Sequence, residues 1–255
     1  MILIANSCLA EILFSSNLLS MAISTLTNDR GQNESEGVFC ILQGYLSYVG
    51  YALQNYCFLL QAFFHYMIVA YPTHLYYQTI KFQSILIGLV WIFSFVYSIP
   101  FIVTNQIKYN ISNQICQMSL GFSFFGIYTA LCIYGIPISL IVGMYFQIVR
   151  HVSDMTKHVL ASTNLLFRAK RELKMIRRIV ILLLIIITIG LPYEIFSFMA
   201  FFTSPPKYYL RITFLCVDVS LPIMMITLFI FTEPLQAAIK RQLHIRHNLV
   251  ATAVA

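Results

Sequence analysis

Six long apolar stretches constrain the fold of this chain more than any other feature. They cover about residues 2–24, 38–70, 84–104, 120–148, 175–203 and 208–231. A helix needs roughly 20 mostly apolar residues to cross the hydrocarbon core of a bilayer, and each stretch reaches that length. Because lipid offers the backbone no hydrogen bonds, the stretches should be helices rather than isolated strands. The sequence therefore predicts an all-α membrane protein with a single transmembrane domain over residues 1–255.

The composition excludes a soluble fold and argues against nucleic-acid binding. Charged residues make up 10% of the chain and apolar residues 59%, whereas ordinary soluble domains carry about 25% charged residues. The formal net charge is +7, but the basic residues lie between apolar stretches and do not line a soluble face. Membrane orientation and contact with lipid explain them better, so we expect no nucleic-acid partner.

The distribution of charge predicts how the chain is oriented. Twelve of the 16 Lys and Arg residues fall on one side of the predicted membrane: Lys81, Arg150, Lys157, Arg168, Lys170, Arg171, Lys174, Arg177, Arg178, Lys240, Arg241 and Arg246. An excess of Lys and Arg marks the cytoplasmic side. The opposite side holds Cys40, Cys116 and the N-glycosylation sequons at Asn33 and Asn110, and both features are typical of an extracellular side. We expect a multi-pass plasma-membrane protein with both chain ends in the cytoplasm.

A short amphipathic helix is predicted after the last span, over about residues 233–246. Leu235, Ile239 and Leu243 follow at a spacing of four, and basic residues lie on or near the other face. This pattern is typical of a helix on the inner leaflet of the membrane. The alternative is a frayed basic tail.

Several short motifs occur in an order and spacing typical of one receptor family. The sequence NSCLAE at residues 6–11 is similar to that family's N-L-A-x-x-D, with Glu11 in place of Asp. Cys40 stands 25 residues before His65, and FHY at 64–66 occupies the place of D-R-Y. Further matches are Trp91 within a span, Pro137 eight residues before Tyr145, and Pro192. On these residues the chain resembles a rhodopsin-like (class A) G-protein-coupled receptor.

The resemblance begins at the family's second transmembrane helix, so the chain resembles a seven-transmembrane receptor bundle with six spans present. We interpret the missing first helix as a truncated or mis-started gene model, or as a short form. The family implies an extracellular ligand and a heterotrimeric G protein as partners. The sequence has no Gly-rich phosphate loop, nucleophile elbow or paired Cys and His at metal spacing, so we expect neither an enzyme nor a cofactor.

The resemblance implies that Cys40 and Cys116 form a disulfide between the family's third helix and its second outer loop. The disulfide would close the loop between residues 40 and 116 and would stabilise the folded state by about 4 kcal/mol in the chain-entropy model. The alternative is a pair of free thiols.

Two acids in the outer third of the predicted bundle suggest how a ligand is recognised. Glu194 and Asp218 lie on the family's sixth and seventh helices, where its ligands bind. Two carboxylates there suggest a cationic ligand group such as an arginine, an amine or a peptide N-terminus. The alternative is that the acids pair with Lys207 or Arg211, or extend outward to water.

Three further residues would line the same cavity. Ser47 falls where monoamine receptors carry Asp, so a peptide-like or cationic ligand is favoured over a monoamine. Tyr51 and Tyr193 would contact the ligand, or serve only in packing.

Glu11 falls at the family's sodium-binding position. An acid within a span usually faces the bundle interior and pairs with another group. The neighbouring positions hold Gln54 and Met225, a poorer oxygen shell. The alternatives are a possible sodium site and a protonated or water-solvated carboxyl group.

The residues implied in G-protein coupling are His65, Tyr66, Tyr145 and Arg177. His65 replaces the family's arginine, and Phe64 removes its carboxylate partner. Met225-Ile226 stands where Asn-Pro is usual. These departures suggest weakened coupling and leave open a non-signalling receptor remnant. A third, less favoured interpretation is an ion-conducting or transport protein that uses the membrane acids.

Overall fold

The computed structural model describes most of the chain from residue 2 to residue 231. The described residues are 2–31, 37–71, 76, 79–111, 113–118, 123–158, 184, 188, 191, 195, 196, 198, 199, 202, 203 and 208–231. Within them, three helices are long and apolar enough to cross a membrane: Ile2–Asp29, Ile80–Val103 and Phe124–His151. The number of six spans stays a prediction, and the predicted helix at 233–246 lies outside the described residues.

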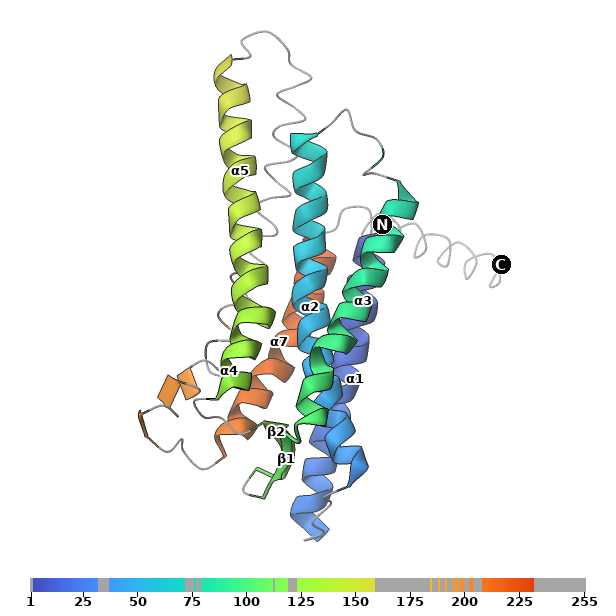
Figure 1. Cartoon of the computed structure of the whole chain (residues 1–255), viewed down its shortest axis with the longest axis vertical. Helices are drawn as coiled ribbons and strands as arrows, with labels where there is room; N and C mark the ends of the chain where they lie inside the picture. The colour runs from blue at the N-terminus through green and yellow to red at the C-terminus, as the bar shows by residue number, and fades with distance from the viewer. Residues whose placement is uncertain are drawn as a thin grey trace, which may run out of the picture.

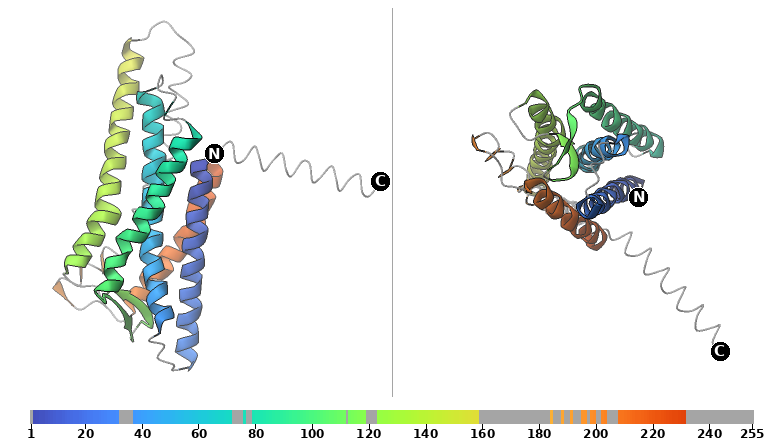
Figure 2. Two further views of the ribbon diagram at one scale, coloured as in Figure 1. Left: turned by 45° about the vertical axis from the view of Figure 1, so that its right-hand side comes forward. Right: turned by 90° about the horizontal axis from the view of Figure 1, so that it is seen from below.

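The helices run side by side along the long axis of the molecule (Figure 1). They are α1 (Ile2–Gly31), α2 (Val38–Ala70), α3 (Ile80–Val103), α4 (Phe124–Thr129), α5 (Ile136–His158) and α7 (Tyr209–Phe231). Helix α2 packs against α1, α3 and α5, while α7 packs against α1, as the end-on view in Figure 2 shows. Helix α1 continues to Gly31, past the predicted limit at 24, because the last polar residues of the helix can extend beyond the lipid.

A short β-hairpin covers one end of the bundle, which we call the hairpin end; we call the opposite end the far end. Strands β1 (Ile107–Asn110) and β2 (Ile115–Met118) pair antiparallel. All four residues of β2 are buried. A Cβ on Gly44 of α2 would lie 2.7 Å from the Cys116 carbonyl oxygen, so the hairpin approaches α2 this closely only because residue 44 is glycine. The apolar-span pattern contained no signal for these strands.

Helix α5 begins with an irregular turn. Residues Ala130–Gly135 form one π-helical turn between α4 and α5, just before Pro137. Proline has no N–H and cannot donate a hydrogen bond to the preceding turn. A single π-helical turn is one way in which a helix adjusts to such an interruption. The Tyr56 hydroxyl of α2 donates to the Cys132 carbonyl oxygen at 3.0 Å, so α2 supplies a donor to the widened turn.

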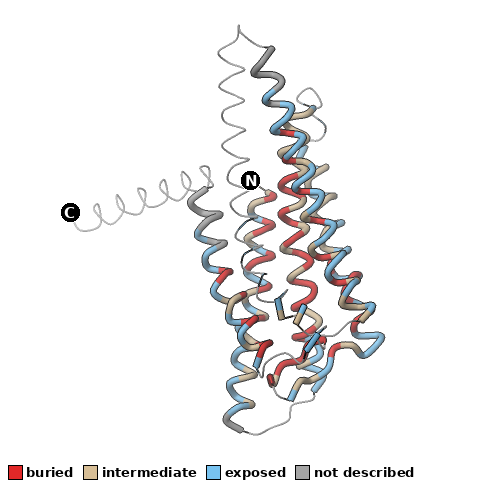
Figure 3. The backbone as a smooth tube through the Cα atoms, turned by 90° about the vertical axis from the view of Figure 1, so that its left-hand side faces the viewer, coloured by how far each residue is buried: buried red, intermediate tan, exposed pale blue. Residues whose placement is uncertain are grey.

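Buried and half-buried polar side chains join α1 to α2 along most of their length. The hydrogen bonds of this contact include Gln61 Nε2 to Ser7 Oγ at 2.6 Å, Gln54 Nε2 to Glu11 Oε1 at 2.9 Å, Asn17 Nδ2 to Ser47 Oγ at 2.9 Å, and Gln43 Nε2 to Ser20 Oγ at 2.8 Å. Hydrogen bonds between polar side chains of neighbouring helices stabilise helix packing in lipid. Figure 3 shows the buried positions running along the inward faces of the helices.

Candidate functional site

The structure contains the disulfide that the resemblance implied. Cys40, at the start of α2, is bonded to Cys116 of β2, with 5.5 Å between the two Cα atoms. The bond fastens the hairpin to α2 beside the close contact at Gly44. One covalent link and one glycine therefore help to set the position of the hairpin over the helix ends.

Arg211 links three elements at the hairpin end. From the first turn of α7, its Nη1 and Nη2 donate to Asp29 Oδ2 and Oδ1 of α1 at 2.9 and 2.8 Å. Its Nε donates to the Asn113 carbonyl oxygen in the hairpin turn at 3.0 Å. The guanidinium carbon lies 5.2 Å from the ring centroid of Tyr208. We call this set of contacts the Arg211 clamp. The sequence offers Arg211 as an alternative partner of Asp218, whereas the structure pairs it with Asp29.

A cavity of about 240 Å³ lies between α1 and α7, and Asp29 and Arg211 of the Arg211 clamp form part of its lining. We call it the α1–α7 groove. Its lining residues are Leu18, Met21, Ala22, Thr25, Leu26, Asp29, Ile115, Arg211, Phe214, Leu215 and Asp218. Leu26 and Leu215 of its lining are 55% and 66% exposed. Asp218 is half-buried and has no hydrogen bond or ion pair within the described part of the chain.

Of the predicted ligand residues, the structure describes Ser47, Tyr51 and Asp218. Asp218 lines the α1–α7 groove, but the Ser47 side chain is fully buried between α1 and α2. The Ser47 hydroxyl donates to the Gln43 carbonyl oxygen at 3.0 Å. Tyr51 packs edge-to-face on Phe14, with 4.8 Å between the ring centroids. Ser47 and Tyr51 both make helix-packing contacts, and their role in ligand binding stays a prediction. Tyr193 and Glu194 lie outside the described residues.

Glu11 is buried, and its immediate shell does not suit sodium. The Gln54 Nε2 amide donates to Glu11 Oε1 at 2.9 Å, whereas a sodium ion needs oxygen ligands. Glu11 Oε2 has no hydrogen-bond partner among the described residues. The side chain of Met225 lies outside the described part of the structure. A donor thus occupies one carboxylate oxygen while the other is without a partner in the described chain, and the sodium site stays a prediction.

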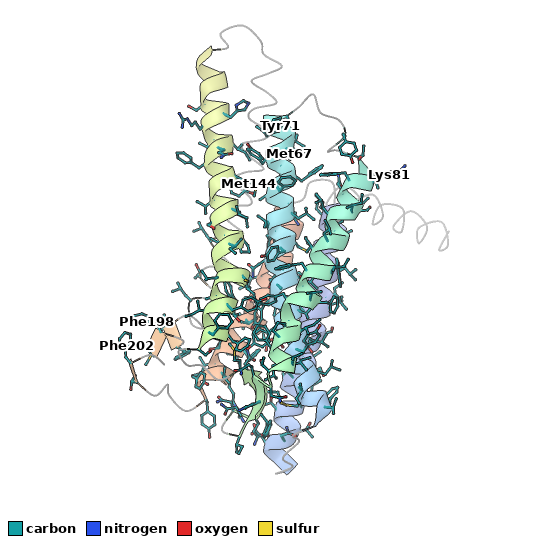
Figure 4. The ribbon with its side chains drawn as sticks, viewed as in Figure 1. Met67, Tyr71, Lys81, Met144, Phe198 and Phe202 are labelled. Atoms are coloured by element: carbon teal, nitrogen blue, oxygen red, sulfur yellow. A yellow bond between two sulfur atoms is a disulfide. The ribbon has the colours of Figure 1, made fainter. Side chains whose placement is uncertain are left out.

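One polar atom of α2 and one of α5, towards the far end, are without hydrogen-bond partners among the described residues. His65 Nδ1 and the Tyr145 hydroxyl are both buried and unbonded within the described ranges. Figure 4 shows Met67, Tyr71 and Met144 gathered in the same region. The Tyr66 ring lies 6.4 Å from the Tyr71 ring, centroid to centroid. Arg177, the fourth predicted coupling residue, lies outside the described residues.

Of the two N-glycosylation sequons, the structure describes the asparagine of one, Asn110. Asn110 ends β1 and its Oδ1 accepts from the Asn113 backbone N–H at 3.1 Å, so this sequon begins in the hairpin turn. Asn33 lies outside the described residues.

The pairing of Asp29 with Arg211 was not predicted from the sequence. Opposite charges at the same predicted membrane surface were the one signal for it. The two residues stand 182 positions apart in the chain, so the contact depends on how α7 packs against α1.

Among the described residues no cluster of three or more His, Cys, Asp or Glu could hold a metal ion.

Comparison with known proteins identifies the family. No curated protein matches the chain. The family model described as "7 transmembrane receptor (rhodopsin family)" matches residues 1–234. This match covers all the described residues, including the disulfide, the Arg211 clamp and the far-end residues of α2 and α5. The chain therefore belongs to the 7 transmembrane receptor (rhodopsin family).

Proposed function

We propose that this protein is a receptor that binds an extracellular ligand at the hairpin end and passes the signal to a heterotrimeric G protein at the far end. The family match over residues 1–234 carries the proposal. The orientation is supported by the Cys40–Cys116 disulfide and the Asn110 sequon, which both lie at the hairpin end. Disulfides and N-linked glycans belong to the outer surface of a cell.

The proposed ligand carries a cationic group that pairs with Asp218. A carboxylate within a span costs about 2.5–3.5 kcal/mol on insertion scales, and such acids usually face a cavity and pair with another group. In the described arrangement Arg211 pairs with Asp29 and donates to the Asn113 carbonyl oxygen, and no bond joins it to Asp218. We propose Glu194 and Tyr193 as further contacts of the cationic group.

The proposed coupling surface includes His65, Tyr66, Tyr145 and Arg177. A buried polar atom without a hydrogen bond costs roughly 1–3 kcal/mol. His65 Nδ1 and the Tyr145 hydroxyl both bear this cost in the described arrangement. A second arrangement in which either group finds a partner would recover part of that free energy. The proposed ligand acts by favouring that second arrangement over the first.

A G-protein dissociation sensor in cells tests the recognition of a cation. We expect a panel of small cationic compounds to contain activators, while their neutral analogues of the same shape are inactive. Replacing both acids, Asp218→Asn with Glu194→Gln, should abolish activation without lowering surface expression. Equal activation by neutral analogues, or an unchanged response of the double variant, would refute cation recognition.

One observation favours a second candidate, a receptor remnant that binds but does not signal. His65 stands where the family's arginine stands, beside Phe64 in place of an acid, and its Nδ1 is buried without a partner in the described residues. A shorter, partly charged side chain presents less positive charge to a G protein. A chain that binds cations but never releases G protein would support this candidate.

A further inference from the structure

We propose that a cavity between α1, α2 and α3 binds a small, uncharged, apolar molecule that carries one hydrogen-bond donor. We call it the α1–α2–α3 cavity. Its volume is about 280 Å³, and its lining residues are Ala10, Leu13, Phe14, Ser16, Asn17, Leu46, Val49, Gly50, Leu53, Trp91 and Phe95. None of them is among the residues assigned above to ligand binding, G-protein coupling or a sodium site, so this site lies outside the proposed function.

Hydrogen bonds hold the three helices around the cavity. Trp91 Nε1 of α3 donates to Asn6 Oδ1 of α1 at 2.9 Å. The Tyr45 hydroxyl of α2 donates to the Phe95 carbonyl oxygen of α3 at 3.0 Å. The polar contacts described above join α1 to α2. Each pair of helices around the cavity is therefore bonded, so the walls are built before any ligand arrives.

The walls suit an aromatic or short hydrocarbon body. Eight of the eleven lining residues have no polar atom in their side chains. The Trp91 and Phe95 rings are stacked, with 6.2 Å between their centroids, and a further ring can pack against such an aromatic wall. An apolar cavity of about 150 Å³ is enough for benzene, so the larger volume here holds a substituted ring.

The polar side chains of the walls have already used their donors. The Trp91 N–H is bonded as described above, and the Ser16 hydroxyl donates to the Leu13 carbonyl oxygen at 2.8 Å. The amide nitrogen of Asn17, with its two hydrogens, donates to two oxygens of α2, at 2.9 and 3.1 Å. Backbone N–H groups inside a helix bond to carbonyl groups of the same helix. The lining therefore offers a ligand acceptors and no free donor.

The amide oxygen of Asn17 is the acceptor best placed for a ligand. It accepts no hydrogen bond from any residue that the structure describes, and the side chain is half-buried. Asn17 stands near the middle of the Ile2–Asp29 span, where lipid supplies no donor. A ligand O–H or N–H would satisfy this oxygen, whereas an ether of the same shape would not.

Charge is excluded by the same walls. The eleven lining residues include no acid, no base and no histidine, and an isolated charge in apolar surroundings is costly. The ligand class that fits the cavity is therefore an uncharged alcohol, phenol or amide with an apolar body.

Trp91 gives a direct readout of binding, because it is the one tryptophan of the chain and lines the cavity. The probes are para-bromophenol and para-bromoanisole, which share a brominated ring, while only the phenol carries a donor. Bromine quenches indole fluorescence on contact, so binding in the full chain in lipid nanodiscs appears as saturable quenching. We expect the half-saturating concentration, expressed per lipid, to be about 3- to 10-fold lower for the phenol, the effect of one net hydrogen bond between neutral groups.

Three variants test whether the quenching arises in the cavity. Asn17→Leu removes the acceptor and should abolish the preference for the phenol. Leu46→Phe adds volume inside the cavity and leaves its polar groups in place, so saturable quenching by both probes should disappear. Gln147→Leu makes the same amide-to-hydrocarbon change on α5, which contributes no lining residue, and should leave the quenching unchanged.

The comparison of the two probes in the wild-type chain needs no variant, so it tests the proposal even if a variant fails to fold. Equal half-saturating concentrations for phenol and ether, or quenching that rises without saturation, would overturn it. A preference for the phenol that survives Asn17→Leu, or saturable quenching that survives Leu46→Phe, would overturn it as well.

Discussion

Replacing Arg211 with alanine should destabilise the hairpin end measurably, and the structure allows the cost to be worked out. The Arg211 and Asp29 side chains are 28% and 38% exposed, so solvent screening limits their ion pair to about 0.5–1 kcal/mol. The bond from Nε to the Asn113 carbonyl oxygen adds about 1 kcal/mol after a similar discount. The contact with the Tyr208 ring adds about 0.5 kcal/mol. The sum is about 2 kcal/mol.

Thermal unfolding in nanodiscs would measure this loss. For a chain of this length, about 2 kcal/mol corresponds to a drop of roughly 4–8 °C in Tm. Asp29→Asn should cost less than half as much, because Arg211 keeps its bond to Asn113. The reversed pair, Asp29→Arg with Arg211→Asp, should recover part of the loss of the single variants, with a coupling of about 0.5–1 kcal/mol in the double-mutant cycle.

The matched control is Lys108→Ala, which removes an exposed positive charge from β1 at the same end of the molecule. It should leave Tm unchanged within about 1 °C, because exposed surface substitutions away from special features stay near ±0.5 kcal/mol. The Arg211 clamp would be refuted if Arg211→Ala melts like Lys108→Ala, or if the double-mutant cycle shows no coupling.

Three other predictions rest on the contacts that position the site. Cys40→Ala should abolish surface expression in a cell-surface labelling assay, because the hairpin loses its covalent link to α2; normal expression would show that the disulfide is dispensable. Gly50→Ala should lower Tm, since its new Cβ would lie 2.2 Å from a Phe14 ring atom, whereas Gly88→Ala meets no atom within 4 Å and should raise stability by about 0.5–1 kcal/mol through helix propensity; equal shifts in both variants would contradict the packing argument. Tyr56→Phe should cost about 1 kcal/mol by removing the donor to the widened turn of α5, and a Tm equal to that of the wild-type chain would show that this bond contributes nothing.

The apolar pattern predicted the helices well, because burial in lipid constrains length and composition strongly. The helix over 38–70 was predicted with the bounds that the structure gives to α2. The hairpin at 107–118 was not predicted, because its strands are four residues long and depend on the contact with Gly44 and on the disulfide. The turn at Ala130–Gly135 was also missed, since Pro137 signals an irregularity without specifying its form.

The candidate site was predicted only in part. Asp218 was singled out from the sequence because an acid within a span is unusual, and it does line a cavity. Its neighbours could not be foreseen, since the face that Asp218 presents depends on how α7 packs against α1. Ser47 and Tyr51 were assigned to a ligand by family position, and that assignment stays a prediction; the structure adds their contacts with Asn17 and Phe14.

Nucleotide exchange on a purified heterotrimeric G protein, with this chain reconstituted in lipid vesicles, tests the receptor proposal most directly. We predict exchange above that of protein-free vesicles. Restoring the family's arginine with His65→Arg should raise the rate, and Tyr145→Phe should lower the activated rate by removing the hydroxyl at the far end. Exchange equal to that of empty vesicles for the wild-type chain and for His65→Arg alike would contradict signalling by this chain and favour a receptor that binds without coupling.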